Sequence, residues 1–121
     1  MSQTVVVVGA TPNPERYAYR AMRALLHHGF HPIPVHPTAP EVLGVHCRRS
    51  LADVTETIDT ITLYIGPDRS GPLIESIVAA KPRRLLMNPG AENEELASAA
   101  ETAGILVVRG CTLVMLQDGT F

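Results

Sequence analysis

The fold of this chain is decided by residues 5–15, which read VVVVGATPNPE. Four consecutive valines favour a strand, and the absence of polar alternation indicates that both of its faces are buried, as in an interior strand of a parallel sheet. Gly9 ends this strand. Asn13 as a cap, Pro14 in the first turn and Glu15 near the positive helix end then predict the start of a helix.

The same strand–helix alternation continues along the chain. Apolar residues after the first turn recur at helical spacing and predict one buried helix stripe: Ala18, Ala21, Met22, Leu25 and Leu26. Gly29 ends that helix. We expect further strands at residues 31–36, 58–65, 85–87 and 105–108. We expect helical segments at residues 50–56, from Gly71-Pro72 to residue 81, and at residues 92–103, with a short helix or turn at residues 111–121.

Short links between these elements predict an α/β fold. We expect one doubly wound, mainly parallel, five-stranded Rossmann-like sheet with helices on both faces, in a single domain spanning residues 1–121. The proline-rich strand at residues 31–36 suits an edge position, because proline cannot donate to the ladder. Sheets of this kind bind ligands beyond the carboxyl ends of the strands, where the strand order reverses.

The composition excludes several classes of protein. The chain has 121 residues, of which 45% are hydrophobic and 18% charged, which excludes a disordered tail. A net charge of −2 offers no basic field for nucleic acid. We find no apolar run long enough to cross a membrane and no signal peptide. Cys47 and Cys111 make no disulfide framework, so we expect a cytoplasmic protein.

The first loop indicates a phosphate site but departs from a dinucleotide fingerprint. Gly9 allows a tight exit from the strand, Thr11 offers a hydroxyl, and the helix that follows offers free N–H groups to an anion. The G-x-G-x-x-G spacing is absent, because Thr11 and Pro14 stand at its second and third glycines. His36, not an acid, ends the second strand. A nicotinamide cofactor is therefore disfavoured, and the alternative is that Gly9 and Pro14 only shape the turn.

Charge placement is the second indication of a phosphorylated ligand. Five arginines fall near the carboxyl ends of the predicted strands: Arg16, Arg48, Arg49, Arg69 and Arg109. Arginines gathered there suit a multiply phosphorylated molecule. The alternative, a solvated surface charge, is favoured for Arg48, Arg49 and Arg109.

Catalytic and metal sites are not indicated. His36, His46 and Cys47 lie in one region, but their spacing fits no standard zinc pattern. The acidic residues beside the third predicted strand have no established facing geometry: Asp53, Glu56 and Asp59. The sequence shows no Ser-His-Asp arrangement and no P-loop. We therefore predict no metal site and no catalytic residue.

Several short pieces, taken in order, carry a resemblance to a known family. They are Val7 to Thr11 with Pro14 and Arg16, Gly29-Phe30 with residues 33–37, residues 42–44, Ser50-Leu51 with Ile58-Asp59, residues 88–90 with Asn93-Glu94, and residues 103–105 leading to Cys111. In these the chain resembles the small stand-alone CoA-binding proteins of Rossmann-like fold. That family is related to the CoA-binding domain of the succinyl-CoA synthetase α subunit.

The resemblance implies a site for coenzyme A or an acyl-CoA at the strand ends. The implied cofactor-binding residues are Gly9, Ala10, Thr11, Arg16, Val35, His36, Pro37, Leu43, Gly44, Gly66, Pro67, Asn88 and Gly90. The family usually has Ser, Asn and Gln where Thr11, His36 and Asn88 stand. A histidine in place of asparagine would make binding sensitive to pH. Cys111 is interpreted as a small buried hydrophobe, with a mixed disulfide to the CoA thiol as the alternative.

The function expected from the resemblance is binding without catalysis. The chain would hold CoA or acyl-CoA by its ADP and phosphate groups. Two alternatives stay open: a small NAD(P)-dependent oxidoreductase, and an interaction domain with a decayed nucleotide site. A homodimer, or an enzyme that uses acyl-CoA, is a possible partner, and no nucleic-acid or membrane partner is expected.

Overall fold

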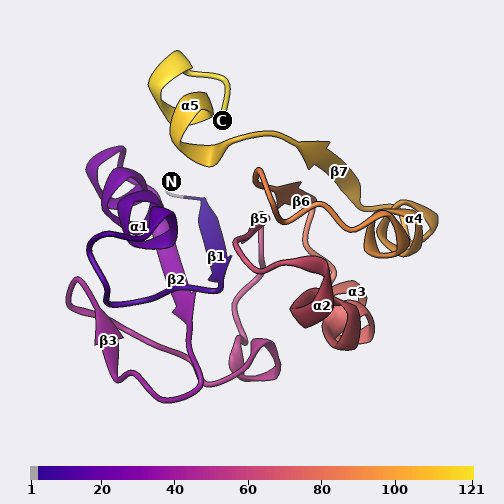
Figure 1. The fold of residues 1–121 in the computed structure, drawn as a ribbon, viewed down its shortest axis with the longest axis horizontal. Helices are drawn as coiled ribbons and strands as arrows, with labels where there is room; N and C mark the ends of the chain where they lie inside the picture. Colours follow the sequence, from indigo (N-terminus) through magenta and orange to yellow (C-terminus); the bar gives the residue numbers. More distant parts are fainter. Residues whose placement is uncertain (1–2) are drawn as a thin grey trace.

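One five-stranded sheet forms the centre of the protein. The computed structural model describes residues 3–121 and is shown in Figure 1. All strand pairs of the sheet are parallel, in the order β2-β1-β5-β6-β7. The strands are β1 (Thr4–Val8), β2 (His31–Val35), β5 (Thr60–Leu63), β6 (Arg84–Met87) and β7 (Leu106–Arg109). The predicted five-stranded parallel sheet is confirmed, and β2 lies at an edge as its prolines suggest.

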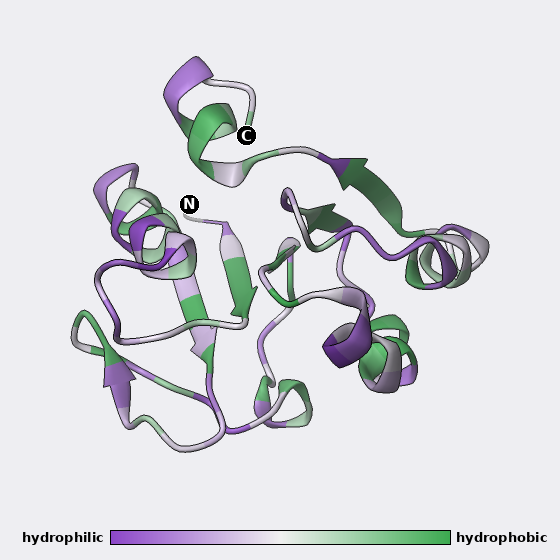
Figure 2. Cartoon of the chain, viewed as in Figure 1, coloured by the Kyte–Doolittle hydropathy of each residue, from purple (hydrophilic) through white to green (hydrophobic). Residues whose placement is uncertain are grey.

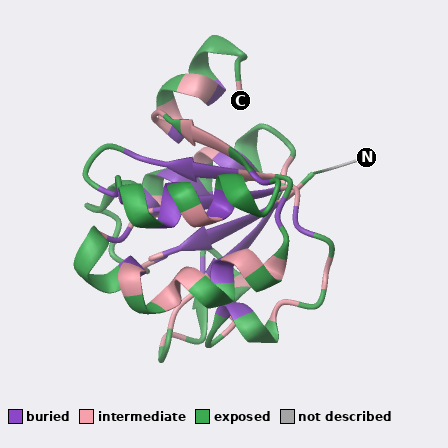
Figure 3. Ribbon diagram, turned by 90° about the vertical axis from the view of Figure 1, so that its right-hand side faces the viewer, coloured by how far each residue is buried: buried purple, intermediate pink, exposed green. Residues whose placement is uncertain are grey.

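Helices cover both faces of this sheet. The helical segments are α1 (Tyr17–His27), η1 (Leu51–Asp53), α2 (Pro67–Ser70), η2 (Gly71–Leu73), α3 (Ile74–Ala80), α4 (Glu94–Thr102) and α5 (Thr112–Asp118). Side chains of α1 and α5 pack in one core cluster, and those of η1, α3 and α4 in the other. Figure 3 shows the buried strands between helices whose outer surfaces are exposed. The chain is therefore doubly wound.

The valine run is buried as predicted, because its side chains alternate between the two faces of the sheet. Val6 and Val8 join the cluster with α3 and α4, whereas Val5 and Val7 join the cluster with α1. None of the four is more than 4% exposed. In Figure 2 this strand is among the hydrophobic segments at the centre of the molecule. An all-apolar strand is what a sheet covered on both faces requires.

Two helix boundaries were placed wrongly by the sequence pattern. α1 begins at Tyr17 rather than at Pro14, because Asn13 closes a separate turn: its Oδ1 accepts from the N–H of Glu15 (3.0 Å) and its carbonyl from that of Arg16 (3.2 Å). The helical stretch after β5 begins at Pro67, not at Gly71-Pro72. Gly71 keeps helical dihedrals (φ −51°, ψ −51°) and does not break the path.

The prediction that Leu26 belongs to the buried stripe of α1 is also wrong. Leu26 is 39% exposed, whereas Ala18, Ala21, Met22 and Leu25 are buried. The buried stripe on this 11-residue helix is narrower than the apolar pattern indicates: Met22 and Leu25 pack in the core cluster, and Leu26 does not.

A two-stranded antiparallel hairpin lies outside the main sheet. It comprises β3 (Glu41–Val42) and β4 (Val45–His46), and the sequence predicts only a loop there. Leu43 and Gly44 form its two-residue turn, and both have positive φ (52° and 77°), as a type I′ turn requires. Leucine is rare at such a position, which is why the hairpin signal is missing from the sequence.

Candidate functional site

An open cleft lies at the carboxyl ends of the strands. Its volume is about 1040 Å³, and it is lined by residues that follow β1, β2, β5 and β6. In the sheet order, the chain moves from β1 outward to β2 and then back past β1 to β5, so the strand order reverses between β1 and β5. Ligand sites of doubly wound sheets lie at this kind of reversal. Predicted site residues that line the cleft are Gly9, Ala10, Thr11, Arg16, Val35, His36, Pro37 and Gly90.

Gly9 brings the exits of β1 and β5 close together. Its φ is +93°, and a Cβ built on it would lie 2.8 Å from Ile65 Cγ2 and 3.1 Å from the carbonyl carbon of Tyr64. Just before it, the carbonyl of Val8 accepts from the N–H of Tyr64 (2.9 Å). Only a residue without a side chain fits between these two chains, so the floor of the cleft depends on Gly9.

The first turn of α1 presents free backbone donors to the cleft. Arg16 is the extended N-cap residue and makes no side-chain cap, and the first turn of the helix carries no acidic residue. The first N–H with a partner in the helix is that of Arg20, which donates to the carbonyl of Arg16 (3.2 Å). The helix therefore presents free N–H groups beside the cleft, with Glu15 as the acidic residue just before its N-cap, and such an end suits an anion.

His36 shapes the loop after β2. Its Nδ1 accepts from the backbone N–H groups of Thr38 (3.1 Å) and Ala39 (2.8 Å). Because Nδ1 accepts, the neutral ring carries its proton on Nε2. An asparagine side chain closes a turn in the same way, by accepting from the backbone two or three residues ahead. The imidazole thus closes the turn after β2 as an asparagine side chain would.

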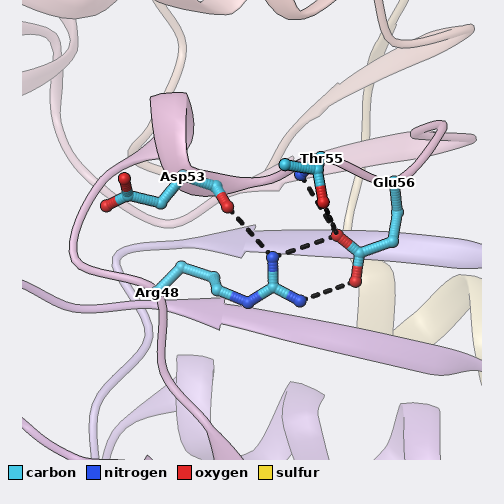
Figure 4. A network of polar contacts seen from close by, with 4 residues as sticks. All are labelled: Arg48, Asp53, Thr55 and Glu56. Atoms are coloured by element: carbon cyan, nitrogen blue, oxygen red, sulfur yellow. Dashed lines mark hydrogen bonds and ion pairs between the residues drawn. The ribbon is translucent and has the colours of Figure 1, made fainter.

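An ion pair between Arg48 and Glu56 holds the part of the cleft wall that η1 forms (Figure 4). Arg48 Nη2 lies 2.6 Å and Nη1 3.0 Å from the two carboxylate oxygens of Glu56, and Nη1 also donates to the carbonyl of Asp53 (3.1 Å). The Arg48 guanidinium holds the pKa of Glu56 at about 2, below its usual range. This clamp ties residues 49–52, which line the cleft, to the chain that follows them.

The ion pair between Arg48 and Glu56 should make the free energy of unfolding depend on pH in the acidic range. Since the pKa of Glu56 is lowered in the folded protein, the ion pair stabilises the fold above about pH 5, and its contribution is lost as the pH falls to about 2. We expect Glu56→Gln to lower the free energy of unfolding by about 1 kcal/mol at pH 7, because the pair is partly exposed. Urea denaturation of both proteins across this pH range measures the difference. A difference that stays constant down to pH 3 would contradict the assignment.

Three arginines in the cleft wall have no acidic partner among residues 3–121: Arg16, Arg49 and Arg69. The interpretation as a solvated surface charge is wrong for Arg48, which is half-buried and binds Glu56. It is confirmed for Arg109, which is exposed, with its Nη2 2.7 Å from Oε1 of the exposed Glu94. Arg49 is exposed, as expected of a surface charge, but it lines the cleft.

Five predicted site residues do not line the cleft. Leu43 and Gly44 form the tip of the β3–β4 hairpin. Gly66 and Pro67 start α2, and Gly66 lies near the cleft-lining Gly90, whose carbonyl oxygen would be 3.9 Å from a Cβ on Gly66. Asn88 is 2% exposed. A role for these residues in ligand binding stays a prediction.

Asn88 is committed to a buried hydrogen-bond network. Its Nδ2 donates to Thr62 Oγ1 (2.7 Å) and to the carbonyl of Leu63 (2.9 Å), and its Oδ1 accepts from the N–H of Thr112 (2.9 Å). The hydroxyls of Thr62 and Thr112 are 2.8 Å apart. This network joins the ends of β5 and β6 to the start of α5.

Tyr64 lies between this network and the cleft. Its ring lines the cleft, while its hydroxyl is buried and has no hydrogen-bond partner among residues 3–121. Burial raises the pKa of the Tyr64 hydroxyl to about 12, so it is protonated at neutral pH. Cys111 is half-buried and precedes α5, outside the residues that line the cleft.

Part of the cleft wall, Leu73 and Ser76, was missed by the sequence pattern, which singled out only Arg69 in this stretch. Arg69, Leu73 and Ser76 come from α2, η2 and α3, and Leu73 packs in the same apolar cluster as Leu51 of η1. Their spacing of four and three residues is that of one helix face. The sequence holds this spacing, but the break assumed at Gly71 divides it, so the shared face becomes visible only when the helical path is continuous.

No helix within residues 3–121 is long and apolar enough to cross a membrane. No group of three His, Cys, Asp or Glu side chains in that range is placed to hold a metal ion.

Known proteins are similar to this chain in sequence and fold. Residues 3–117 match the family described as CoA binding domain. A crystal structure of an uncharacterized protein is 44% identical, with a TM-score of 0.94 over the whole chain and 99% of its own. The Bacillus subtilis uncharacterized protein YneT is 26% identical over 88% of this chain and 79% of its own length.

A larger enzyme contains a similar unit. The acetyl-coenzyme A synthetase 1 of Ca. Korarchaeum cryptofilum, described as dinucleotide forming and in complex with phosphate and ADP, is 25% identical with a TM-score of 0.77. The similarity covers 89% of this chain but 25% of that protein. The Rossmann-like α/β fold is shared by all of these structures.

Proposed function

This chain belongs to the CoA binding domain family, and on that premise we propose that it binds CoA or an acyl-CoA in the cleft through the ADP moiety, without catalysing a reaction by itself. The observation that carries the proposal is the position of the cleft. It lies at the strand-order reversal, beside the free N–H groups at the start of α1 and beside three arginines that form no ion pair within residues 3–121. These features favour an anionic ligand.

The diphosphate belongs over the turn after β1. Gly9 keeps this turn flat, and Thr11 and the first amides of α1 supply neutral donors. Arg16, as the N-cap residue of α1, adds a charge at the same point. Backbone donors at a helix start together with one guanidinium match the chemistry of a diphosphate.

The base belongs in the apolar part of the cleft. Leu51 and Ala52 of η1 line this part together with Ile65 and Leu73, and Leu51, Ile65 and Leu73 pack in one apolar cluster. Aliphatic walls suit the flat faces of a purine, since both are poorly hydrated. The hydroxyls of Ser50 and Ser76 at this part of the cleft supply polar contacts for the edge of the base.

The histidine of the cleft, His36, does not supply a general base. A general base needs a free ring nitrogen within reach of its substrate. His36 Nδ1 already accepts from two backbone N–H groups, so it is not free to take a proton. The remaining nitrogen carries a hydrogen and can only donate. This arrangement supports binding rather than proton transfer.

Thermal denaturation with added ligand tests the proposal. We expect CoA and acetyl-CoA to raise the apparent stability, by about 2.7 kcal/mol at a ligand concentration 100 times the Kd, while NADH and NADPH leave it unchanged. Acetyl-CoA recovered after prolonged incubation should be intact. A shift with a nicotinamide cofactor alone would favour an oxidoreductase, and no shift with any of the four would favour an interaction domain.

Arg16 provides a prediction within this site. We expect Arg16→Gln to weaken CoA binding by about 1.5–3 kcal/mol, the range for a hydrogen bond to a charged group. Isothermal titration calorimetry measures the change. Arg23→Gln is the matched control, because Arg23 lies on the same helix but outside the cleft. Equal affinity in Arg16→Gln and the unmodified protein would remove Arg16 from the site.

A further inference from the structure

Arg49 is held at the edge of the cleft by the backbone beside it. The N–H of His36 donates to the carbonyl of Arg48 (2.9 Å), and the N–H of Arg48 donates to the carbonyl of Pro34 (2.9 Å). These bonds pin the segment along the outer edge of β2. Arg48 turns to Glu56, whereas Arg49, in the bend that follows, lines the cleft.

Arg49 connects two hollows of the surface. It lines the cleft, and it also lines a smaller hollow of about 350 Å³ next to the β3–β4 hairpin. Thr38 and His46 line this second hollow as well, and they add a hydroxyl and an imidazole. Asp53 is its acidic residue, and one of its oxygens lies 3.3 Å from Ser50 Oγ.

The charge of Arg49 is not compensated. Its neighbour Arg48 is neutralised by Glu56 at 2.6 Å, but within residues 3–121 no carboxylate forms an ion pair with Arg49. Two adjacent arginines therefore have different roles. Arg48 holds two segments of the chain together, and Arg49 keeps its five N–H donors free at the junction of the two hollows.

The position beside β2 indicates which ligand group meets this charge. In doubly wound sheets the end of the second strand meets the ribose, where an acid binds a free hydroxyl and an arginine accommodates a ribose phosphate. Here β2 is followed by His36, which is not an acid, and Arg49 lies alongside. The geometry points to Arg49 as the residue that recognises a phosphate on the ligand's ribose, the 3′-phosphate of CoA.

This inference rests on the proposed function. It predicts that the chain binds CoA more tightly than dephospho-CoA. Calorimetric titrations of CoA and dephospho-CoA into the unmodified protein, Arg49→Gln and Arg49→Lys measure the selectivity. We expect CoA to bind at least about tenfold more tightly than dephospho-CoA, from hydrogen bonds to a charged group. Arg49→Gln should remove this difference by weakening CoA alone, and Arg49→Lys should retain part of it.

The outcomes separate the inference from the proposed function. Equal binding of CoA and dephospho-CoA to the unmodified protein would overturn the role of Arg49 and leave CoA binding in place. If neither ligand binds, the proposed function fails as well. Arg49-dependent binding of NADPH in preference to CoA would assign the ribose phosphate to a nicotinamide cofactor and overturn the CoA assignment. Arg23→Gln, away from both hollows, should behave as the unmodified protein.

Discussion

Replacement of Gly9 by alanine is expected to lower the free energy of unfolding by about 3 kcal/mol. Two effects add: a side chain at a φ of +93° is strained, and the new Cβ would lie 2.8 Å from Ile65 Cγ2. The Ile65 side chain can move, but the backbone of Tyr64, 3.1 Å away, cannot move without separating β5 from β1. Urea denaturation measures the loss. We expect weaker CoA binding as well, because the floor of the cleft widens.

Gly29 is the matched control for this substitution. It has a similar φ of +82°, but a Cβ on it would meet nothing within 4 Å. Gly29→Ala therefore reports the strain alone, about 1 kcal/mol. The difference between the two variants isolates the close approach of β1 and β5. Equal destabilisation by both substitutions would show that the crowding at Gly9 has no energetic effect.

The second large effect is expected at Asn88. Removal of its side chain by Asn88→Ala leaves the buried N–H of Thr112 without a partner and takes one of two partners from the Thr62 hydroxyl. Unsatisfied buried groups and the vacated space together should destabilise the protein by about 3 kcal/mol. Since Asn88 does not line the cleft, the CoA affinity of the folded variant should change less than in Arg16→Gln.

A double-mutant cycle with Thr62 tests whether the network acts as a unit. Thr62→Val removes the hydroxyl at nearly constant volume, and the two substitutions should be non-additive by about 1 kcal/mol. Asn13→Ala is the control for stability alone, because it removes an exposed hydrogen bond and should cost less than about 1 kcal/mol. If Asn88→Ala leaves the stability unchanged but abolishes CoA binding, Asn88 belongs to the ligand site after all.

Part of the candidate site could be predicted because it is local in sequence. Gly9 to Thr11 and Arg16 follow one strand directly, and Val35 to Pro37 follow another, so the strand pattern alone places both groups at the same edge. The wall made by Leu51 and Leu73 joins residues distant in sequence and could not be read in this way. The different roles of Arg48 and Arg49 could not be predicted from the sequence either. Only the backbone pairing along β2 decides which of the two side chains turns to Glu56.

A parallel sheet that is buried on both faces requires an uninterrupted apolar strand such as Val5 to Val8, and glycine and proline mark where the strands end. The parallel α/β sheet could therefore be predicted from the sequence. The sequence also indicated an anionic ligand at the start of α1. Tertiary structure alone decided what each polar side chain does. The side chains of Asn88 and Arg48 could each bind a ligand. In the fold, Asn88 instead forms hydrogen bonds with buried polar groups, and Arg48 forms an ion pair with Glu56. Arg16, Arg49 and Arg69 have no such partner among residues 3–121, so their charges stay available in the cleft.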